Sequence, residues 1–262
     1  SGKSVITYKL GKSDLGKELA KSHTGAIAGS DDAFNAFIKY NGIKRVHIFE
    51  SLIEVPNLFK NKKLPEGNRI GIVTTTGGGG AMVVESLSST DIEVIDPELL
   101  ISKLIDRYNI PLNKNKVVDL TIAGTKPEVV SDAIKYFMDD NDCDLVVMVV
   151  GSSAKFRPDQ AVEPLVKFGK YKKPLAVYIA PDAPEALKLL HQHDIACFRT
   201  PESCAEGIKA YLNTKAPKKN IEKSYNFEDI SNKLKGSPNK NLSEKNSLEI
   251  FKEIGINTVH FE

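Results

Sequence analysis

The sequence predicts an α/β protein built on a parallel, doubly wound sheet with helices on both faces. Between Arg69 and Leu212, apolar strand patterns alternate with helix patterns five times, and this alternation is typical of a parallel sheet covered by helices. Two of the strand patterns, RIGIVT at 69–74 and DLVVMVV at 144–150, are apolar on both sides, as buried parallel strands are. The order of these elements favours a sheet of flavodoxin-like type.

The composition is that of a soluble globular protein. Its 262 residues are 41% hydrophobic and 27% charged, which suits one large or two ordinary domains. A net charge of +2 gives no reason to expect a nucleic acid or a membrane surface as partner. No apolar run approaches the ~20 residues of a membrane span, and the lysine-punctuated amino terminus is not a signal peptide. Cys143, Cys197 and Cys204 are widely spaced and form no metal pattern. Cys143 and Cys197 adjoin strand patterns, where buried, reduced thiols are expected, and a cytoplasmic protein is indicated.

The first sixty residues show shorter element patterns. Apolar residues at helical spacing, followed by Asn41-Gly42, predict a helix that Ser30 or Asp31 caps. Pro56 weakens the last helix pattern, so two shorter pieces are an alternative. The expected elements are a strand at 4–9, helices at 15–21 and 31–41, a strand at 43–48 and a helix at 50–59.

A lysine-rich stretch at 61–68, with Pro65 and Gly67, predicts a linker. The regular alternation follows it. Strands are expected at 69–74, 92–95, 117–120, 144–150, 174–179 and 195–198. Helices are expected at 81–87, 97–108, 126–138, 157–168, 183–192 and 201–212, and Thr200 is expected to cap the last one.

A second lysine- and proline-containing stretch, 214–225, predicts another linker. Helix patterns at 227–234 and 242–254, the latter capped by Ser243, precede a strand pattern at 256–261. Because a lone helix–strand unit cannot bury its own apolar face, we interpret this piece as the start of a larger domain.

One histidine lies among small and hydroxyl-bearing residues in the segment KSHTGAIAGSDD at 21–32. Glycine lets a backbone approach a ligand closely, and the helix start that follows offers N–H groups to an anion. In this setting His23 can serve as a proton shuttle, a metal ligand or a nucleophile. It can also be structural or merely exposed, and the local pattern leaves these alternatives open.

Four consecutive glycines, Gly77, Gly78, Gly79 and Gly80, follow the strand pattern at 69–74. A strand, a glycine loop and a helix in this order bring a helix N-terminus close to a phosphate, and Thr76 adds a hydroxyl. The loop is not a P-loop, because no Gly-Lys-Ser/Thr follows, and it lacks the acidic residue of a dinucleotide fingerprint. We therefore predict an anion site, with a tight turn that needs glycine only for packing as the alternative.

A second small-residue turn, Gly151, Ser152 and Ser153, ends the most hydrophobic strand pattern. Folds of this type place ligands at the carboxyl ends of central strands, so these residues are expected to lie near the ligand. His191 and His193 flank a helix end and are expected at the surface. We find no zinc spacing and no nucleophile elbow, and no metal site is expected.

The histidine and glycine segments, in this order, resemble the NDP-forming acyl-CoA synthetases, a family that includes the ADP-forming acetyl-CoA synthetases and is related to succinyl-CoA synthetase. The segment at 22–31 looks like the family's phosphohistidine loop, and 69–87 is similar to its strand, loop and phosphate-facing helix. Val118-Asp119-Leu120 resembles a further signature, and 242–259 looks like the start of an ATP-grasp domain.

The resemblance implies three parts. Residues 1–64 are expected to be the C-terminal part of a succinyl-CoA synthetase-like domain that carries the phosphohistidine loop. Residues 65–213 are expected to form a flavodoxin-like ligase domain, and 214–262 a linker and the beginning of an ATP-grasp domain. The family's CoA-binding domain and most of its ATP-grasp domain are missing, so the chain is expected to be a central region that is inactive alone.

The resemblance also implies a mechanism. ATP phosphorylates His23, phosphohistidine passes the group to a carboxylic acid, and CoA attacks the acyl phosphate. Thr76, Gly25 and the four glycines are expected to bind the phosphoryl group. CoA, ATP or ADP and Mg²⁺ are expected in the intact enzyme, this chain alone is expected to bind no more than phosphate, and a homodimer is implied. The alternative is a regulatory, ligand-sensing module, such as those fused to protein acetyltransferases.

Overall fold

The computed structural model describes residues 4–24, 29–88, 91–214, 227–235 and 242–254, together with 256 and 258. The chain divides into two compact units, Ser1–Lys218 and Lys219–Glu262. The finer boundaries expected at 64/65 and 213/214 stay predictions.

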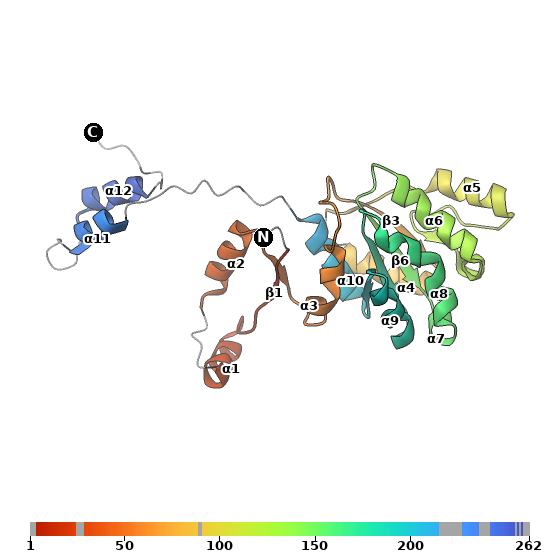
Figure 1. The fold of residues 1–262 in the computed structure, drawn as a ribbon, viewed down its shortest axis with the longest axis horizontal. Coiled ribbons are helices and arrows are strands. Elements are labelled where there is room, and N and C mark those ends of the chain that lie inside the picture. Colours follow the sequence, from red (N-terminus) through yellow and green to blue (C-terminus); the bar gives the residue numbers. More distant parts are fainter. Residues whose placement is uncertain are drawn as a thin grey trace. The chain divides into compact units, whose positions relative to one another are not determined.

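A six-stranded parallel sheet organises the first unit, as predicted (Figure 1). Strands β4, β3, β6, β7 and β8 lie side by side in this order, and β5 also pairs with β3. The strands are β3 (Arg69–Thr74), β4 (Glu93–Val94), β5 (Val118–Asp119), β6 (Leu145–Val150), β7 (Leu175–Ile179) and β8 (Ala196–Phe198). The two strands with unbroken apolar patterns, β3 and β6, pair along five residues at the centre.

Alternate residues of the central strands enter two separate cores, one on each face of the sheet. Val146, Met148 and Val150 belong to the first core, which the helices α5, α6, α8 and α9 cover. Leu145 and Val147 belong to the second core, which α4 and α10 cover. The helices are α4 (Gly77–Leu87), α5 (Glu98–Tyr108), α6 (Pro127–Asp139), α8 (Pro158–Val166), α9 (Pro184–Gln192) and α10 (Pro201–Leu212). Apolar residues on both sides of each strand therefore produce the doubly wound arrangement.

The amino-terminal region adds a small parallel sheet to the same unit. Strand β1 (Ile6–Tyr8) pairs with β2 (Lys44–Val46), and α1 (Asp14–Thr24) and α2 (Asp31–Tyr40) lie between them in the chain. Val46 enters the second core, against α10. The Glu206 carboxylate of α10 accepts hydrogen bonds from the N–H groups of His47 and Ile48. The region is thus fixed to the face of the large sheet that α4 and α10 cover.

Several element boundaries differ from the prediction. The pattern at 50–59 forms two pieces, α3 (Ser51–Glu54) and the 3-10 helix η1 (Val55–Leu58), which is the alternative that Pro56 suggested. The helix expected at 157–168 starts close to its predicted position, as α8 (Pro158–Val166), but ends two residues early, where the 3-10 helix η3 (Lys167–Lys170) follows. The short α7 (Ser153–Phe156) before it was not expected. The 3-10 helix η2 (Thr121–Thr125) was not expected.

The second unit holds two helices, α11 (Phe227–Lys235) and α12 (Glu244–Glu253). Ser243 caps α12 as predicted, because its side chain accepts a hydrogen bond from the Asn246 N–H. The strand expected at 256–261 falls largely outside the described residues. Among the described helices of both units, none is long and apolar enough to cross a membrane.

Candidate functional site

The carboxyl ends of β3, β5 and β6 meet at one edge of the sheet. The strand register places Thr74 opposite Asp119 on one side and opposite Val149 on the other. The N–H of Gly151 donates to the Thr75 hydroxyl over 3.0 Å. The structure therefore brings together the threonine–glycine segment after β3 and the small-residue turn after β6, which are far apart in the sequence.

The four glycines form a helical turn, so the prediction of a glycine loop before a helix at 81–87 is wrong. Helix α4 already begins at Gly77, and the Gly80 N–H makes a helical bond to the Thr76 carbonyl over 3.0 Å. Glycine disfavours helix interiors but costs little where a helix begins.

The start of α4 is open. Thr76 is the N-cap residue, with an extended backbone, and its side chain makes no capping hydrogen bond. The backbone N–H of Thr76 donates to the Thr74 hydroxyl over 3.0 Å. Gly77 and Gly78 are exposed. The first N–H groups of a helix have no partner within the helix, and together with the helix dipole they attract an anion.

Packing explains some of these glycines and not others. A β-carbon on Gly79 would lie 2.8 Å from Thr76 Cγ2 and 2.9 Å from Val149 Cγ1. On Gly77 it would lie 2.9 Å from Asp119 Oδ2. On Gly78, however, it would meet no atom within 4 Å. Close packing therefore explains why residue 79 is a glycine, but it does not explain why residue 78 is one. At Gly78 the exposed backbone is the remaining explanation.

Asp119 is a candidate site residue to which the sequence analysis assigned no role, although it lies in the segment Val118-Asp119-Leu120 that resembles a family signature. It ends β5, and its Oδ1 accepts a hydrogen bond from the Thr121 N–H over 3.0 Å, while Oδ2 faces Gly77. A carboxylate at this position can accept a hydrogen bond from an imidazole or hydroxyl group that approaches α4. The signal in the sequence was an acidic residue at the end of a short strand pattern.

The small-residue turn after β6 lies against Thr76. A β-carbon on Gly151 would approach Thr76 Cβ to 3.1 Å, so glycine permits close contact there. Ser152 and Ser153 are exposed at the start of α7. They are thus available to a ligand at the same edge.

The backbone of His23 lies in α1, which extends to Thr24, so the helix predicted to end at residue 21 is longer. The side chain of His23 and the residues 25–28, Gly25 among them, lie outside the described part. The far end of the segment is fixed: Lys9 Nζ donates to the Gly29 carbonyl over 3.1 Å, and Ser30 caps α2. The roles assigned to His23 and Gly25 stay predictions.

Asp31 anchors the beginning of α2. Its carboxylate receives two hydrogen bonds from the Arg45 guanidinium, of 2.7 and 2.9 Å, and a third from Lys9. The bonds from Arg45 and the neighbouring positive charges hold the pKa of Asp31 well below its usual value. The segment that contains His23 is therefore held at this end by an ionised carboxylate.

Other candidate chemistry is absent from the part of the chain that the structure describes. No group of three histidine, cysteine or acidic residues there can hold a metal ion. The three cysteines are buried and free, as predicted for Cys143 and Cys197. Burial raises the pKa of Cys143 to about 11 and that of Cys197 to about 12. His191 and His193 are exposed, also as predicted.

The comparisons with known proteins agree with this architecture. Residues 1–59 match the family model of the succinyl-CoA ligase-like flavodoxin domain. The chain is 27% identical over 217 residues to the alpha subunit of the ADP-forming acetate–CoA ligase II of Pyrococcus furiosus, a match that covers 80% of this chain and 47% of that subunit. The chain is related to the ADP-forming acetate–CoA ligases. The resemblance inferred from the histidine and glycine segments is confirmed.

Two further comparisons concern a second ligase sequence and the fold. The ADP-forming acetate–CoA ligase of Methanocaldococcus jannaschii is 40% identical over 84 residues, which are 32% of this chain and 12% of that protein. The acetyl-coenzyme A synthetase 1 of Candidatus Korarchaeum cryptofilum, solved in complex with phosphate and ADP, has the same fold with a TM-score of 0.64. It is 23% identical, and the match covers 79% of this chain and 46% of that one. The chain spans about half the length of the Pyrococcus furiosus alpha subunit.

Proposed function

We propose that this chain is the phosphoryl-carrying part of an acyl-CoA synthetase of the NDP-forming kind, with His23 as the carrier. The observation that carries the proposal is the exposed, uncapped start of α4 at Gly77 and Gly78, in a chain whose relatives are ADP-forming CoA ligases. Such a helix start suits a doubly charged phosphoryl group that must be held and then released.

The chemistry begins at His23. A neutral imidazole nitrogen attacks the γ-phosphorus of ATP, the bond from that phosphorus to the bridging oxygen breaks, and ADP leaves. A carboxylate oxygen of the acid then attacks the phosphorus of phosphohistidine and releases the imidazole. The CoA thiol attacks the carbonyl carbon of the acyl phosphate, inorganic phosphate leaves with the bonding electrons, and the thiol proton passes to solvent or phosphate.

The edge of the sheet would receive the phosphorylated histidine. The N–H groups of Gly77 and Gly78 face the charge on the phosphoryl oxygens, and the Thr76 hydroxyl adds a donor. The Asp119 carboxylate lies beside Gly77 and would accept a hydrogen bond from the imidazole N–H that does not carry phosphorus. The small-residue turn Gly151–Ser153 would border the transferred group.

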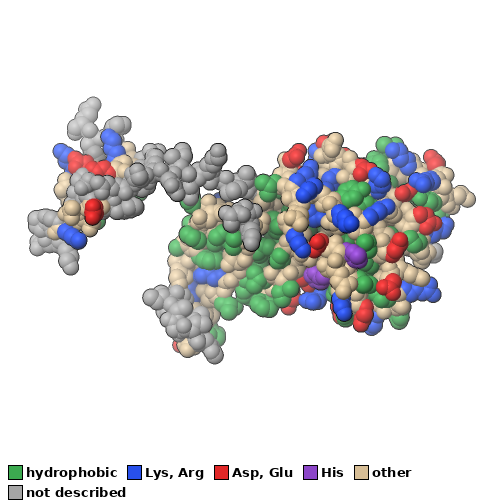
Figure 2. All heavy atoms as spheres, in the orientation of Figure 1, with side chains coloured by type: hydrophobic (Ala, Val, Ile, Leu, Met, Phe, Trp, Pro, Cys, Tyr) green, Lys and Arg blue, Asp and Glu red, His purple; other side chains and the backbone are tan. Residues whose placement is uncertain are grey.

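Residues 1–64 would belong to a larger succinyl-CoA synthetase-like domain. Their parallel sheet has only two described strands, which is too small to be stable alone. Figure 2 shows hydrophobic side chains gathered on this side of the first unit. The large apolar side chains exposed on residues 1–64 include Val5, Leu10, Leu15, Leu19, Phe37, Phe49 and Ile53. CoA and the nucleotide with its Mg²⁺ would be bound by other domains, since the described residues offer no metal cluster.

The test uses the intact ligase that contains this chain, incubated with Mg²⁺ and [γ-³²P]ATP. We expect protein-bound label that is stable in base and labile in acid, and its loss in His23→Asn. His191→Asn is the matched control, because His191 is exposed and distant in sequence, and it should label like the parent. Undiminished labelling of His23→Asn contradicts the proposal.

A second pair of variants tests the helix start. Gly78→Asp adds a carboxylate where a β-carbon meets nothing within 4 Å, so it repels a phosphoryl group without disturbing packing. We expect CoA-thioester formation to fall at least tenfold in Gly78→Asp and to be nearly unchanged in Gly78→Ala. Retained nucleotide or CoA binding without any thioester formation by the parent protein would instead favour the regulatory, ligand-sensing module.

A further inference from the structure

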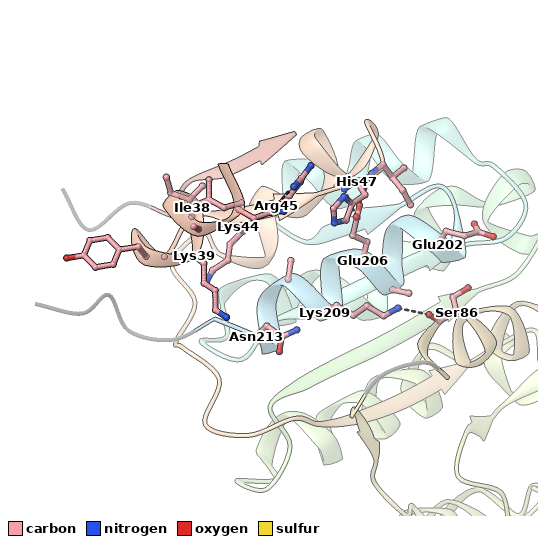
Figure 3. A pocket seen from close by; sticks show the side chains of 18 residues that line it. Ile38, Lys39, Lys44, Arg45, His47, Ser86, Glu202, Glu206, Lys209 and Asn213 are labelled. Carbon is pink, nitrogen blue, oxygen red and sulfur yellow. Dashed lines mark hydrogen bonds between the residues drawn. The ribbon is translucent and has the colours of Figure 1, made fainter. Parts of the chain in front are cut away.

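A large cleft lies at the other end of α4 from the glycine turn and takes no part in the function proposed above (Figure 3). It has a volume of about 1460 Å³ and lies between α2 and β2 on one side and α10 on the other, with Ser86 of α4 at its border. Ligand pockets commonly measure about 300–1,000 Å³, so this cleft has room for a small molecule with an extended body.

Most charged groups that line the cleft are already engaged. Arg45 is paired with Asp31, 2.7 Å away, and its side chain is 8% exposed. The Glu206 carboxylate accepts the N–H groups of His47 and Ile48. Lys209 Nζ donates to the Ser86 carbonyl over 3.0 Å.

Two lysines remain. Within the described part of the chain, the side-chain ammonium groups of Lys39 and Lys44 have no hydrogen bond and no ion pair. Figure 3 shows both side chains at the same end of the cleft, on the side of Asn213 at the end of α10. Lys44 is partly buried, and this burial lowers its pKa. Lys39 is exposed. A dianion that reaches both ammonium groups would offset the desolvation of the Lys44 ammonium.

Beyond these lysines, mainly apolar and small side chains line the cleft. They are Ala36 and Ile38 of α2, Ile43 before β2, and Ala205 and Ala210 of α10. Small side chains leave the width of the cleft open, and an apolar body of a ligand would lose its contact with water there.

We propose that this cleft binds a phosphate monoester with an apolar body, its phosphate held by Lys39 and Lys44 with the Asn213 amide, and its body lying along the alanine and isoleucine walls. A dianionic head matches two ammonium groups, and lysine is a common partner of phosphate. Because Arg45 and Lys209 already have partners, the phosphate group binds at the end of the cleft where Lys39 and Lys44 lie. This site is separate from the start of α4 and does not depend on His23.

Calorimetry on the 262-residue chain tests the proposal, with n-octyl phosphate, octanoate and inorganic phosphate as probes. We expect saturable binding of octyl phosphate with a stoichiometry of one, and at least tenfold weaker binding of both octanoate and inorganic phosphate. The first comparison shows the need for a dianionic head, and the second shows the need for an apolar body.

Three variants locate the site. Lys44→Met and Lys39→Met should each weaken octyl phosphate binding at least tenfold, and Ala36→Trp should block it by filling the cleft while both lysines remain. Ala36 and Lys39 are exposed, so two of these variants keep the fold even if Lys44→Met does not. Lys116→Met, at an exposed lysine outside the cleft, is the matched control and should bind like the parent.

Amide chemical shifts in the same titration separate this site from the start of α4. Octyl phosphate should shift the amides of Lys44 and Ala210, whereas inorganic phosphate at the proposed phosphoryl site should shift those of Gly77 and Gly78. The proposal is overturned if octyl phosphate does not bind, if it binds Ala36→Trp and Lys39→Met as tightly as the parent, or if its shifts map to Gly77 and Gly78 alone.

Discussion

Asp119 Oδ2 lies so close to the backbone of Gly77 that a β-carbon on this glycine would approach it to 2.9 Å. The adjacent Gly78 has no atom within 4 Å of the same position. Both residues occupy the first turn of α4, so they differ in their surroundings rather than in their place in the helix. This contrast makes a matched pair of substitutions.

Gly77→Ala should be less stable than Gly78→Ala. Replacing glycine by alanine in a helix gains up to about 1 kcal/mol, and Gly78→Ala should keep part of that gain. Gly77→Ala must displace the Asp119 carboxylate, which also accepts the Thr121 N–H, and we expect a net loss of about 1 kcal/mol in the free energy of unfolding. Urea unfolding of both variants measures the difference, and equal stabilities would contradict the steric argument.

Asp119→Asn should strengthen the binding of inorganic phosphate at the start of α4. The amide has the same shape and keeps an acceptor for the Thr121 N–H, but it removes a negative charge beside the helix start. We expect the dissociation constant for phosphate, followed through the amide shifts of Gly77 and Gly78, to fall about threefold or more at low ionic strength. Salt screens this effect, so the two proteins should converge near 1 M salt; a constant ratio would indicate that the charge is not responsible.

Sequence patterns predicted the strands of the sheet well, but they predicted the site at the carboxyl ends of β3, β5 and β6 less well. Strands such as Arg69–Thr74 are buried on both faces, so their own residues reveal them. Gly77 to Gly80 were expected to form a loop because glycine disfavours helices, but they begin a helix where that preference has little weight. The partnership of Asp119 and Gly77 depends on which strands become neighbours, which local patterns do not encode.

The cleft between α2 and α10 could not be predicted from local sequence patterns either. His47 and Glu206, which close one part of it, are 159 residues apart in the chain. No periodicity or motif links Lys39 and Lys44 to α10. Their shared position became visible only when the amino-terminal region was found packed on the second core.

The buried Glu54 carboxylate should make stability depend on pH. Its side chain is 2% exposed, the Ser203 hydroxyl donates to Oε2 over 2.7 Å, and the Arg199 N–H donates to Oε1 over 3.3 Å. Burial raises the pKa of Glu54 above its ordinary value of 4.5, and the bond from Ser203 opposes that rise. Because the folded state holds the proton more tightly than the unfolded state, this contribution to stability is complete below pH 4.5 and is lost as the pH rises through the folded pKa.

Ser203→Ala should enlarge this loss, since it removes a donor to a buried carboxylate. We expect it to cost about 1–3 kcal/mol in the free energy of unfolding at pH 7.5, and less at pH 4.5, where Glu54 is protonated in more molecules. Glu54→Gln should flatten the dependence. Urea unfolding from pH 4.5 to 7.5 provides the measurement, with Ser88→Ala, an exposed serine, as the control. A Ser203→Ala penalty that is the same at every pH would rule out titration of Glu54 as the cause.

Asp31→Asn should loosen the C-terminal end of the segment 21–32, which contains His23. The stability of this end should then no longer fall at acid pH. Arg45 and Lys9 hold the pKa of Asp31 below its ordinary value of 3.8, so the ionised carboxylate binds both cations. The sign is opposite to that of Glu54: the stabilising contribution is present above pH 3.8 and is lost as the pH falls through the lower folded pKa. Hydrogen exchange of the α2 amides at pH 6 should therefore be faster in Asp31→Asn than in the parent.

Asp32→Asn, one residue along the same helix at an exposed position, is the control for Asp31→Asn and should exchange like the parent. In the intact ligase, we expect Asp31→Asn to lower the rate of phosphoryl labelling from ATP while leaving its final extent unchanged, because the anchor positions the segment and does not take part in the chemistry. Loss of labelling altogether would instead place Asp31 in the reaction itself.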